Sequence, residues 1–257
     1  DALMECLKIY QKMYYRPGSI SVGEIEELRM FYDLEVRYVD EEVGRLLEEL
    51  EEMGVGVDNS YFIVTADHGE LLGEHGALWH GGLLYEPLVR VPLIVAGPSV
   101  KPGLKIDSQV CLMDLAPTIL DLIGGGRAES FMGESLKPLL EESGSGVREW
   151  ERPIILEYAG AGVRRYACRT RRWKYILTIT ARGVEEELYD LGRKPIESVN
   201  MVDETDILES FRKIVLRHIS AELVTWRRSI LKSSFMRRIS SLKELLSRMR
   251  GTPRLGG

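Results

Sequence analysis

The sequence predicts an α/β fold followed by a small antiparallel β subdomain and C-terminal helices. Helical and apolar strand-like segments alternate through residues 1–150, which is typical of an α/β sheet. Short strand-like segments crowd into residues 151–203 and leave no room for crossover helices, so we expect them to pair antiparallel. Residues 204–257 have a helical pattern rich in basic residues. We therefore expect three parts with these boundaries.

A long helix is predicted over about Val22–Met53. Its apolar residues recur every three or four positions and so share one helical face; they are Val39, Val43, Leu46, Leu50 and Met53. Gly54 should end this helix, because glycine readily adopts the left-handed conformation that follows helix C-termini.

Two short apolar runs come next and predict buried strands. The first is Tyr61–Ala66, which stops at Asp67, and the second is Val91–Ala96. A helix should follow and reach Ile123, opening at Met113–Pro117, because proline suits a first helical turn.

After residue 151 the pattern changes to short strands, which we place at Ile154–Tyr158, Tyr166–Thr170, Lys174–Thr178 and Glu187–Tyr189. A helical pattern then covers residues 206–250. It contains His218, which we interpret as structural.

The charge is unevenly distributed. Residues 1–52 hold 14 acidic and 6 basic residues, whereas residues 205–257 hold 12 basic and 4 acidic ones. The basic tail contains an apolar stripe of Leu231, Phe235, Ile239, Leu242, Leu246 and Met249. A basic amphipathic helix can bind a membrane surface or an acidic partner, although we favour packing on the protein's own surface. No motif supports nucleic-acid binding.

The cysteines exclude two common frameworks. Cys6, Cys111 and Cys168 are odd in number and far apart, which argues against a zinc ribbon or a disulfide scaffold. Unpaired cysteines favour a reducing compartment such as the cytoplasm. No membrane-spanning run or signal peptide is visible, but the sequence starts at Asp1 rather than Met, so the compartment stays open.

Three of the four histidines, His68, His75 and His80, cluster where the first strand ends. Ligands bind at the carboxyl ends of strands in open α/β sheets. Asp67 offers a hard oxygen for a divalent cation, and His68 offers a neutral nitrogen or a proton donor. A loop whose histidines only cap backbone groups is the alternative, but the clustering favours a functional site.

Several segments in this region resemble the C-terminal metal-binding block of the sulfatase family, within the alkaline-phosphatase-like superfamily. They are Thr65–Glu70, Gly73–Gly76, Leu78–Gly81 and Leu84–Val95. Further segments follow in the family's order, namely Met113–Leu120, the loop Gly133–Leu140, Arg171–Ile176 and Glu187–Leu191. The resemblance covers about residues 30–203 and implies part of an alkaline-phosphatase-like α/β sandwich.

The resemblance implies roles for single residues. Asp67 and His68 match ligands of one calcium ion, whose shell would be completed by ligands absent from this chain. His80 stands where many members place a sulfate-binding lysine, and a histidine can also donate to an anionic oxygen. His75 and Glu70 are expected to support the loop or the site.

The family's nucleophile segment is missing. Members carry an early Asp-Asp pair and a Cys- or Ser-x-Pro-x-Arg segment whose Cys or Ser becomes formylglycine, and neither occurs here. We therefore assign no catalytic residue and expect part of a longer sulfuric ester hydrolase, incomplete or inactive alone. Its substrate would be a sulfate-ester small molecule or a sulfated glycan.

Two alternatives remain open. One is a phosphodiesterase or phosphonate monoester hydrolase of the same superfamily, because both classes act on tetrahedral anions. The other is a non-catalytic remnant acting in protein association.

Among the remaining residues, Asp114 and Asp121 are interpreted as helix caps or solvated groups. Trp79 and Tyr85 either line a pocket or pack beneath a loop.

Overall fold

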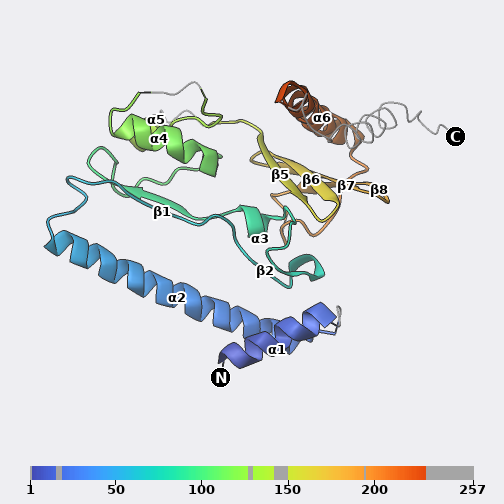
Figure 1. The fold of residues 1–257 in the computed structure, drawn as a ribbon, viewed down its shortest axis with the longest axis horizontal. Helices are drawn as coiled ribbons and strands as arrows, with labels where there is room; N and C mark the ends of the chain where they lie inside the picture. The colour runs from blue at the N-terminus through green and yellow to red at the C-terminus, as the bar shows by residue number, and fades with distance from the viewer. Residues whose placement is uncertain (1, 16–18, 127–129, 142–149, 194, 230–257) are drawn as a thin grey trace.

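The computed structural model describes residues 2–15, 19–126, 130–141, 150–193 and 195–229. The chain begins with two helices, α1 (Ala2–Tyr15) and α2 (Val22–Glu52), which lie beside each other at the N-terminal end (Figure 1). Sequence analysis predicts α2 closely but does not predict α1. Within α1, Ile9 is buried, and Lys12 Nζ lies 2.8 Å from a carboxylate oxygen of Glu24.

The start of α2 follows from a capping box. The Ser21 hydroxyl accepts a hydrogen bond from the Glu24 backbone N–H, and the Glu24 carboxylate accepts one from the Ser21 N–H. These two contacts satisfy backbone donors that the first helical turn leaves without intrahelical partners.

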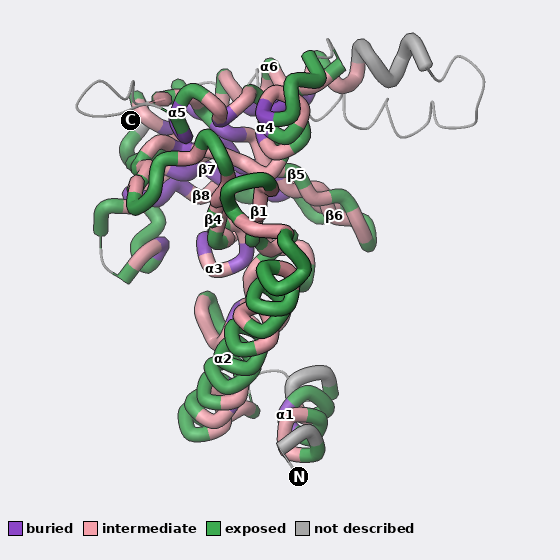
Figure 2. The backbone as a smooth tube through the Cα atoms, turned by 90° about the vertical axis from the view of Figure 1, so that its left-hand side faces the viewer, coloured by how far each residue is buried: buried purple, intermediate pink, exposed green. Residues whose placement is uncertain are grey.

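The apolar face predicted for α2 is not buried by the described residues. Val39, Leu46 and Met53 are 56%, 55% and 77% exposed, and most of α2 is coloured as exposed or intermediate in Figure 2. The helical period is therefore correct, whereas the burial that it normally implies is not found in this part of the chain. An apolar stripe is buried only where a second surface faces it.

A two-stranded antiparallel sheet follows α2. Strand β1 (Phe62–Thr65) pairs with β4 (Leu93–Ala96) so that Thr65 faces Leu93. Between these strands the chain forms β2 (Leu71–Leu72), the short 3-10 helix η1 (Glu74–Gly76), β3 (Leu78–Trp79) and α3 (Glu86–Val89). The β2–β3 hairpin is antiparallel, with Leu71 opposite Trp79.

Helices cover one side of the β1–β4 sheet (Figure 1). They are η2 (Leu112–Asp114), α4 (Leu115–Leu122) and α5 (Lys137–Glu141). Their buried leucines, Leu122, Leu136, Leu139 and Leu140, pack with partly buried residues that include Tyr61, Leu93 and Val95. The segment Gly133–Leu140 was expected to be a loop, but its last four residues belong to α5, because Leu139 and Leu140 of this helix pack into the core.

Asp114 is not a solvated residue but a fully buried one. Its carboxylate accepts hydrogen bonds from the backbone N–H groups of Cys111 and Glu134 and from the Arg152 guanidinium. The capping role expected for Asp114 is therefore combined with a buried ion pair that joins the helical layer to the segment before β5.

The second half of the structure is a four-stranded antiparallel sheet in the order β5-β6-β7-β8. Its strands are Ile154–Gly160, Val163–Arg169, Trp173–Thr180 and Gly183–Asp190, which confirms the four predicted strands and their antiparallel pairing. Helix α6 (Thr205–Ser229) lies over this sheet (Figure 1).

Both faces of the four-stranded sheet are covered. On one face Tyr175, Leu177 and Leu188 pack with Phe211, Val215 and Ile219 of α6. On the other face Ala167, Ile176 and Tyr189 pack with Leu84, Tyr85 and Val89. This second cluster holds the small sheet against the loop region that follows β1.

The apolar stripe predicted for the basic tail, from Leu231 to Met249, lies outside the described residues. Among the helices that are described, none has the length and apolar character required to cross a membrane.

Candidate functional site

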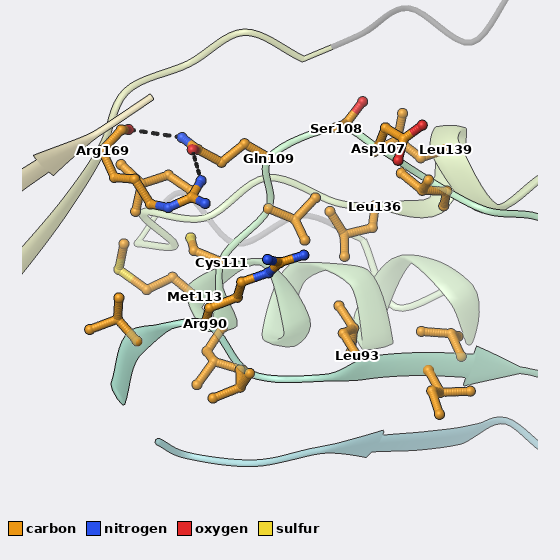
Figure 3. Close-up of a pocket in the computed structure, with 18 of the residues that line it drawn as sticks. Arg90, Leu93, Asp107, Ser108, Gln109, Cys111, Met113, Leu136, Leu139 and Arg169 are labelled. Carbon is orange, nitrogen blue, oxygen red and sulfur yellow. Dashed lines mark hydrogen bonds between the residues drawn. The ribbon is translucent and has the colours of Figure 1, made fainter. Parts of the chain in front are cut away.

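A large cavity lies between the β1–β4 sheet, the α4–α5 layer and the start of the small sheet. Its volume is about 1470 Å³, and Asp67, His68 and His80 all contribute to its lining. Figure 3 shows that polar residues such as Arg90, Gln109 and Arg169 and apolar residues such as Leu93, Leu136 and Leu139 line this cavity. The three residues singled out in the sequence are thus brought to one cavity.

Asp67 and His68 occupy the turn directly after β1. The Asp67 side chain is 89% exposed, and its Oδ1 accepts the His68 backbone N–H at 3.0 Å. His68 Nδ1 lies 2.9 Å from the Gly69 carbonyl oxygen, so this network assigns the proton to Nδ1 and leaves a lone pair on Nε2. Nε2 lies 3.8 Å from Asp67 Oδ2. A potential oxygen ligand and a potential nitrogen ligand for a metal ion therefore face each other.

Gly69 fixes the position of this turn. Its N–H donates to the Leu88 carbonyl oxygen at 2.8 Å. A Cβ atom at this position would overlap the carbonyl group of Pro87. The absence of a side chain lets the turn approach α3 closely, and this approach aims Asp67 and His68.

His80 is held beside His68 by an acidic partner. His80 Nδ1 lies 2.9 Å from Glu70 Oε2, and the His68 and His80 rings are 4.5 Å apart between centroids. The Glu70 side chain is only 19% exposed, whereas that of His80 is 54% exposed. Glu70 thus orients the His80 ring, which agrees with the supporting role that the sequence suggests for it.

The third clustered histidine points elsewhere. The His75 ring stacks on Tyr85 with 3.5 Å between centroids, and its Nε2 lies 3.8 Å from Glu197 Oε2. Trp79 packs edge-to-face against Tyr10 of α1 at 4.9 Å. His75, Trp79 and Tyr85 are not among the residues that line the cavity, so these aromatic rings pack beneath the loop.

A buried charge network next to the cavity was not predicted. Lys174 is fully buried, and its Nζ lies 3.1 Å from Glu86 Oε1 and 2.9 Å from Glu197 Oε1. Arg169 donates to both Glu86 oxygens at 2.9 Å. Burial alone would raise the pKa of Glu86, but hydrogen bonds from Arg169 and the charge of Lys174 outweigh it and lower that pKa. The network ties α3 to the small sheet.

A second group of potential metal ligands lies in the small sheet and its helix. Glu157, His218 and Glu222 each offer a ligand atom, and these atoms lie within 4.8 Å of one another. The group was not predicted from the sequence, because Glu157 is 61 residues from His218 in the chain. The spacing of four residues between His218 and Glu222, which places both on one helical face, was the available signal.

Two family models match the chain. The model described as "Sulfatase" matches residues 10–125, and the model described as "N-sulphoglucosamine sulphohydrolase, C-terminal" matches residues 73–224. Together they cover the cavity, the small sheet and most of α6.

Curated relatives agree with these models. Arylsulfatase K of Mus musculus is 32% identical over 193 residues, which is 73% of this chain and 34% of the relative. Choline-sulfatase of Rhizobium meliloti (strain 1021) is 31% identical over 194 residues, covering 74% of this chain and 36% of the relative. The chain therefore spans about a third of the length of these relatives.

Solved structures share the fold. A protein solved in complex with its substrate D-glucosamine-2-N,6-O-disulfate aligns with a TM-score of 0.65 and 29% identity, covering 81% of this chain and 44% of that one. A phosphonate monoester hydrolase from Silicibacter pomeroyi aligns with a TM-score of 0.64 and 25% identity, covering 82% of this chain and 46% of that one. These alignments confirm the predicted fold class, an alkaline-phosphatase-like α/β arrangement with a small antiparallel sheet.

Proposed function

The chain belongs to the sulfatase family, and from that membership we propose that it supplies the C-terminal part of a metal-dependent sulfuric ester hydrolase. The observation that carries this proposal is the convergence of Asp67, His68 and His80 on one cavity at the end of β1. Because the chain spans about a third of the length of its curated relatives, we propose that a further segment completes the site, and we refer to this chain joined to that segment as the extended protein.

Asp67 and His68 suit a divalent metal ion, which sulfatases generally use. Asp67 Oδ2 and His68 Nε2 face each other across 3.8 Å, and the hydrogen bond at His68 Nδ1 keeps the Nε2 lone pair available. We propose calcium as the ion. Calcium takes roughly six to eight ligands, mostly oxygens, so Asp67 would supply one oxygen, His68 would be a nitrogen contact, and most of the shell would remain to be filled. The remaining ligands would come from the extended protein.

When bound, such an ion polarises the ester oxygens of the substrate. The chain's own part is to present donors to an anion. His80 Nδ1 lies 2.9 Å from the Glu70 carboxylate, and His80 can donate to an anion from Nε2 when its ring carries both protons. Arg90 also lines the cavity and adds positive charge to the same space. A tetrahedral anion is the ligand class that these donors fit.

The substrate class that we propose is a sulfated glycan or a small sulfate ester. The similarity to the N-sulphoglucosamine sulphohydrolase model and to a structure that contains a disulfated glucosamine supports the glycan. The similarity to choline-sulfatase supports the small ester.

A phosphonate monoester hydrolase is the second candidate, because one such enzyme aligns with a TM-score of 0.64. Comparing kcat/KM of the extended protein for an aryl sulfate and for the matching aryl phosphonate monoester separates the two. We expect the sulfate to be preferred, and a preference for the phosphonate would favour the second candidate. A preceding sequence without an Asp-Asp pair and a Cys- or Ser-x-Pro-x-Arg segment would instead favour a non-catalytic role.

A further inference from the structure

Three ligating side chains meet where the edge strand of the small sheet lies against helix α6. Glu157 comes from β5, and His218 and Glu222 come from successive turns of α6. One ligand atom from each lies within 4.8 Å of the other two. Such closeness between two elements far apart in the sequence depends on the packing of Val215 and Ile219 of α6 against the sheet, where both are fully buried.

The surroundings of this group orient its carboxylates. Tyr166 lies opposite Glu157 in the β5–β6 register, and its hydroxyl donates to Glu222 Oε2 at 3.3 Å. Arg164 in turn donates to the Tyr166 hydroxyl oxygen at 3.2 Å. Outer hydrogen bonds of this kind hold ligands in place at metal centres.

The charges in the group repel one another unless a cation is present. Glu157 and Glu222 each bring a carboxylate oxygen to within 4.8 Å of the other, and two negative charges are unfavourable at this separation. His218 Nε2 hydrogen-bonds with Glu157, the more exposed of the two glutamates. A divalent cation among the three side chains would neutralise both carboxylates.

We propose that Glu157, His218 and Glu222 form a second metal site, which binds a divalent transition-metal ion of the zinc class. One imidazole nitrogen and two carboxylate oxygens are a ligand set that zinc accepts, with water completing four-coordination. Three side chains, one of them a nitrogen ligand, offer too few oxygens for the roughly six to eight that calcium takes, and magnesium also prefers oxygen ligands. The site lies in the small sheet and does not depend on the proposed hydrolase function. The His218 and Glu157 side chains are 27% and 37% exposed, so an ion can reach it from solvent.

The competing account is a purely structural contact, in which a protonated His218 pairs with Glu157 and a proton is shared between the two glutamates. Titration calorimetry with Zn²⁺ distinguishes the accounts. The protein should be the 257-residue chain without a histidine tag, carrying Asp67→Ala so that the β1 site does not contribute. We expect one Zn²⁺ to bind per chain. No binding would overturn the proposal.

Three variants in the same background assign the site. His218→Ala and Glu222→Gln should each weaken Zn²⁺ binding at least about tenfold. Glu209→Gln is the matched control, because Glu209 lies on the same helix, is exposed and pairs with Lys213 instead. Equal affinity in all three variants would contradict the assignment.

Two further readouts guard against misfolding and against the wrong metal. Zn²⁺ should raise the Tm of the Asp67→Ala chain, because a ligand that binds the folded state stabilises it. Zn²⁺ should not raise the Tm of the chain that carries both Asp67→Ala and Glu222→Gln. Ca²⁺ at the same concentration should not displace Zn²⁺, and displacement would contradict the zinc-class assignment.

Discussion

One ring nitrogen of His68 and one of His80 lie within hydrogen-bond distance of an acceptor. The second nitrogen of each ring therefore remains for a metal ion or an anion. His68 contacts the Gly69 carbonyl oxygen, and His80 contacts the Glu70 carboxylate. The sequence predicts that both histidines share a site with Asp67, and the structure places all three at one cavity. The Glu70–His80 contact was harder to foresee, because it depends on the hairpin register in which Leu71 pairs with Trp79. That register sets residues 70 and 80 opposite each other.

Replacing Glu70 tests whether this contact matters for the proposed reaction. Glu70→Gln keeps the size of the side chain but removes the negative charge that lies 2.9 Å from His80 Nδ1 and orients the ring. We expect kcat/KM of the extended protein for an aryl sulfate to fall about 10- to 100-fold. Glu74→Gln is the control, because Glu74 is in the same loop but pairs with Arg29. An equal effect of both substitutions would show that Glu70 acts only on loop stability.

Replacing Gly69 tests the turn that aims Asp67 and His68. In Gly69→Ala the new methyl group would overlap the Pro87 carbonyl, so the turn or α3 must move. We expect the free energy of unfolding to fall by about 1–3 kcal/mol, as in other overpacked sites. Gly81→Ala is a matched control, because a Cβ there meets nothing within 4 Å. Chemical denaturation of both variants makes the comparison, and equal stability would contradict this account of the turn.

At the element scale, periodicity predicted the helices and strands better than it predicted their surroundings. The four strands of the small sheet and helix α2 lie close to their predicted positions. On the apolar face of α2, Val39, Leu46 and Met53 are nevertheless exposed, and Val43 and Leu50 are only partly buried. The Lys174 network was also beyond sequence reasoning. Its members Glu86, Lys174 and Glu197 come from three segments that only the tertiary fold brings together.

Lys174 should be essential for joining the small sheet to α3. Lys174→Met removes the cation that lies between two buried carboxylates, and an unpaired buried charge is costly. We expect the free energy of unfolding to fall by about 3–5 kcal/mol in urea titrations. Lys213→Met is the control, because Lys213 and Glu209 form an exposed pair 3.3 Å apart. Such a pair contributes about 0.3–0.5 kcal/mol. If Lys174→Met lowered the free energy of unfolding no more than Lys213→Met does, Lys174 would not be essential for joining the small sheet to α3.

At the scale of the whole molecule, the buried network predicts how stability depends on pH. The pKa of Glu86 is lowered in the folded state, so Glu86 contributes stability above its unfolded value of 4.5. That contribution is lost as the pH falls below 4.5 and through the lowered folded pKa. Glu86→Gln should therefore have a flatter acid limb between about pH 5 and pH 3. Unfolding free energies measured across this range test the slope, and a limb parallel to that of the original protein would contradict it.

The fold class and the family could be predicted from sequence because the residues around Asp67, His68 and His80 form a compact block with an ordered set of later segments. The group of Glu157, His218 and Glu222 could not be predicted, because the sequence gives no sign that Glu157 lies next to α6. We propose that Asp67 belongs to a metal-dependent hydrolase site that this chain supplies only in part, since the chain spans about a third of the length of its curated relatives.

The most direct test is turnover of an aryl sulfate with calcium present. It compares the 257-residue chain, the extended protein, and the extended protein with Asp67→Ala or with the control Asp203→Ala, which alters an exposed residue outside the cavity. We predict no turnover by the chain alone. Asp67→Ala should lower kcat/KM at least about 100-fold, because a bound metal supplies several kcal/mol of transition-state stabilisation, and Asp203→Ala should have no effect. Turnover by the chain alone that survives chelation, or full activity of the extended protein with Asp67→Ala, would contradict the account.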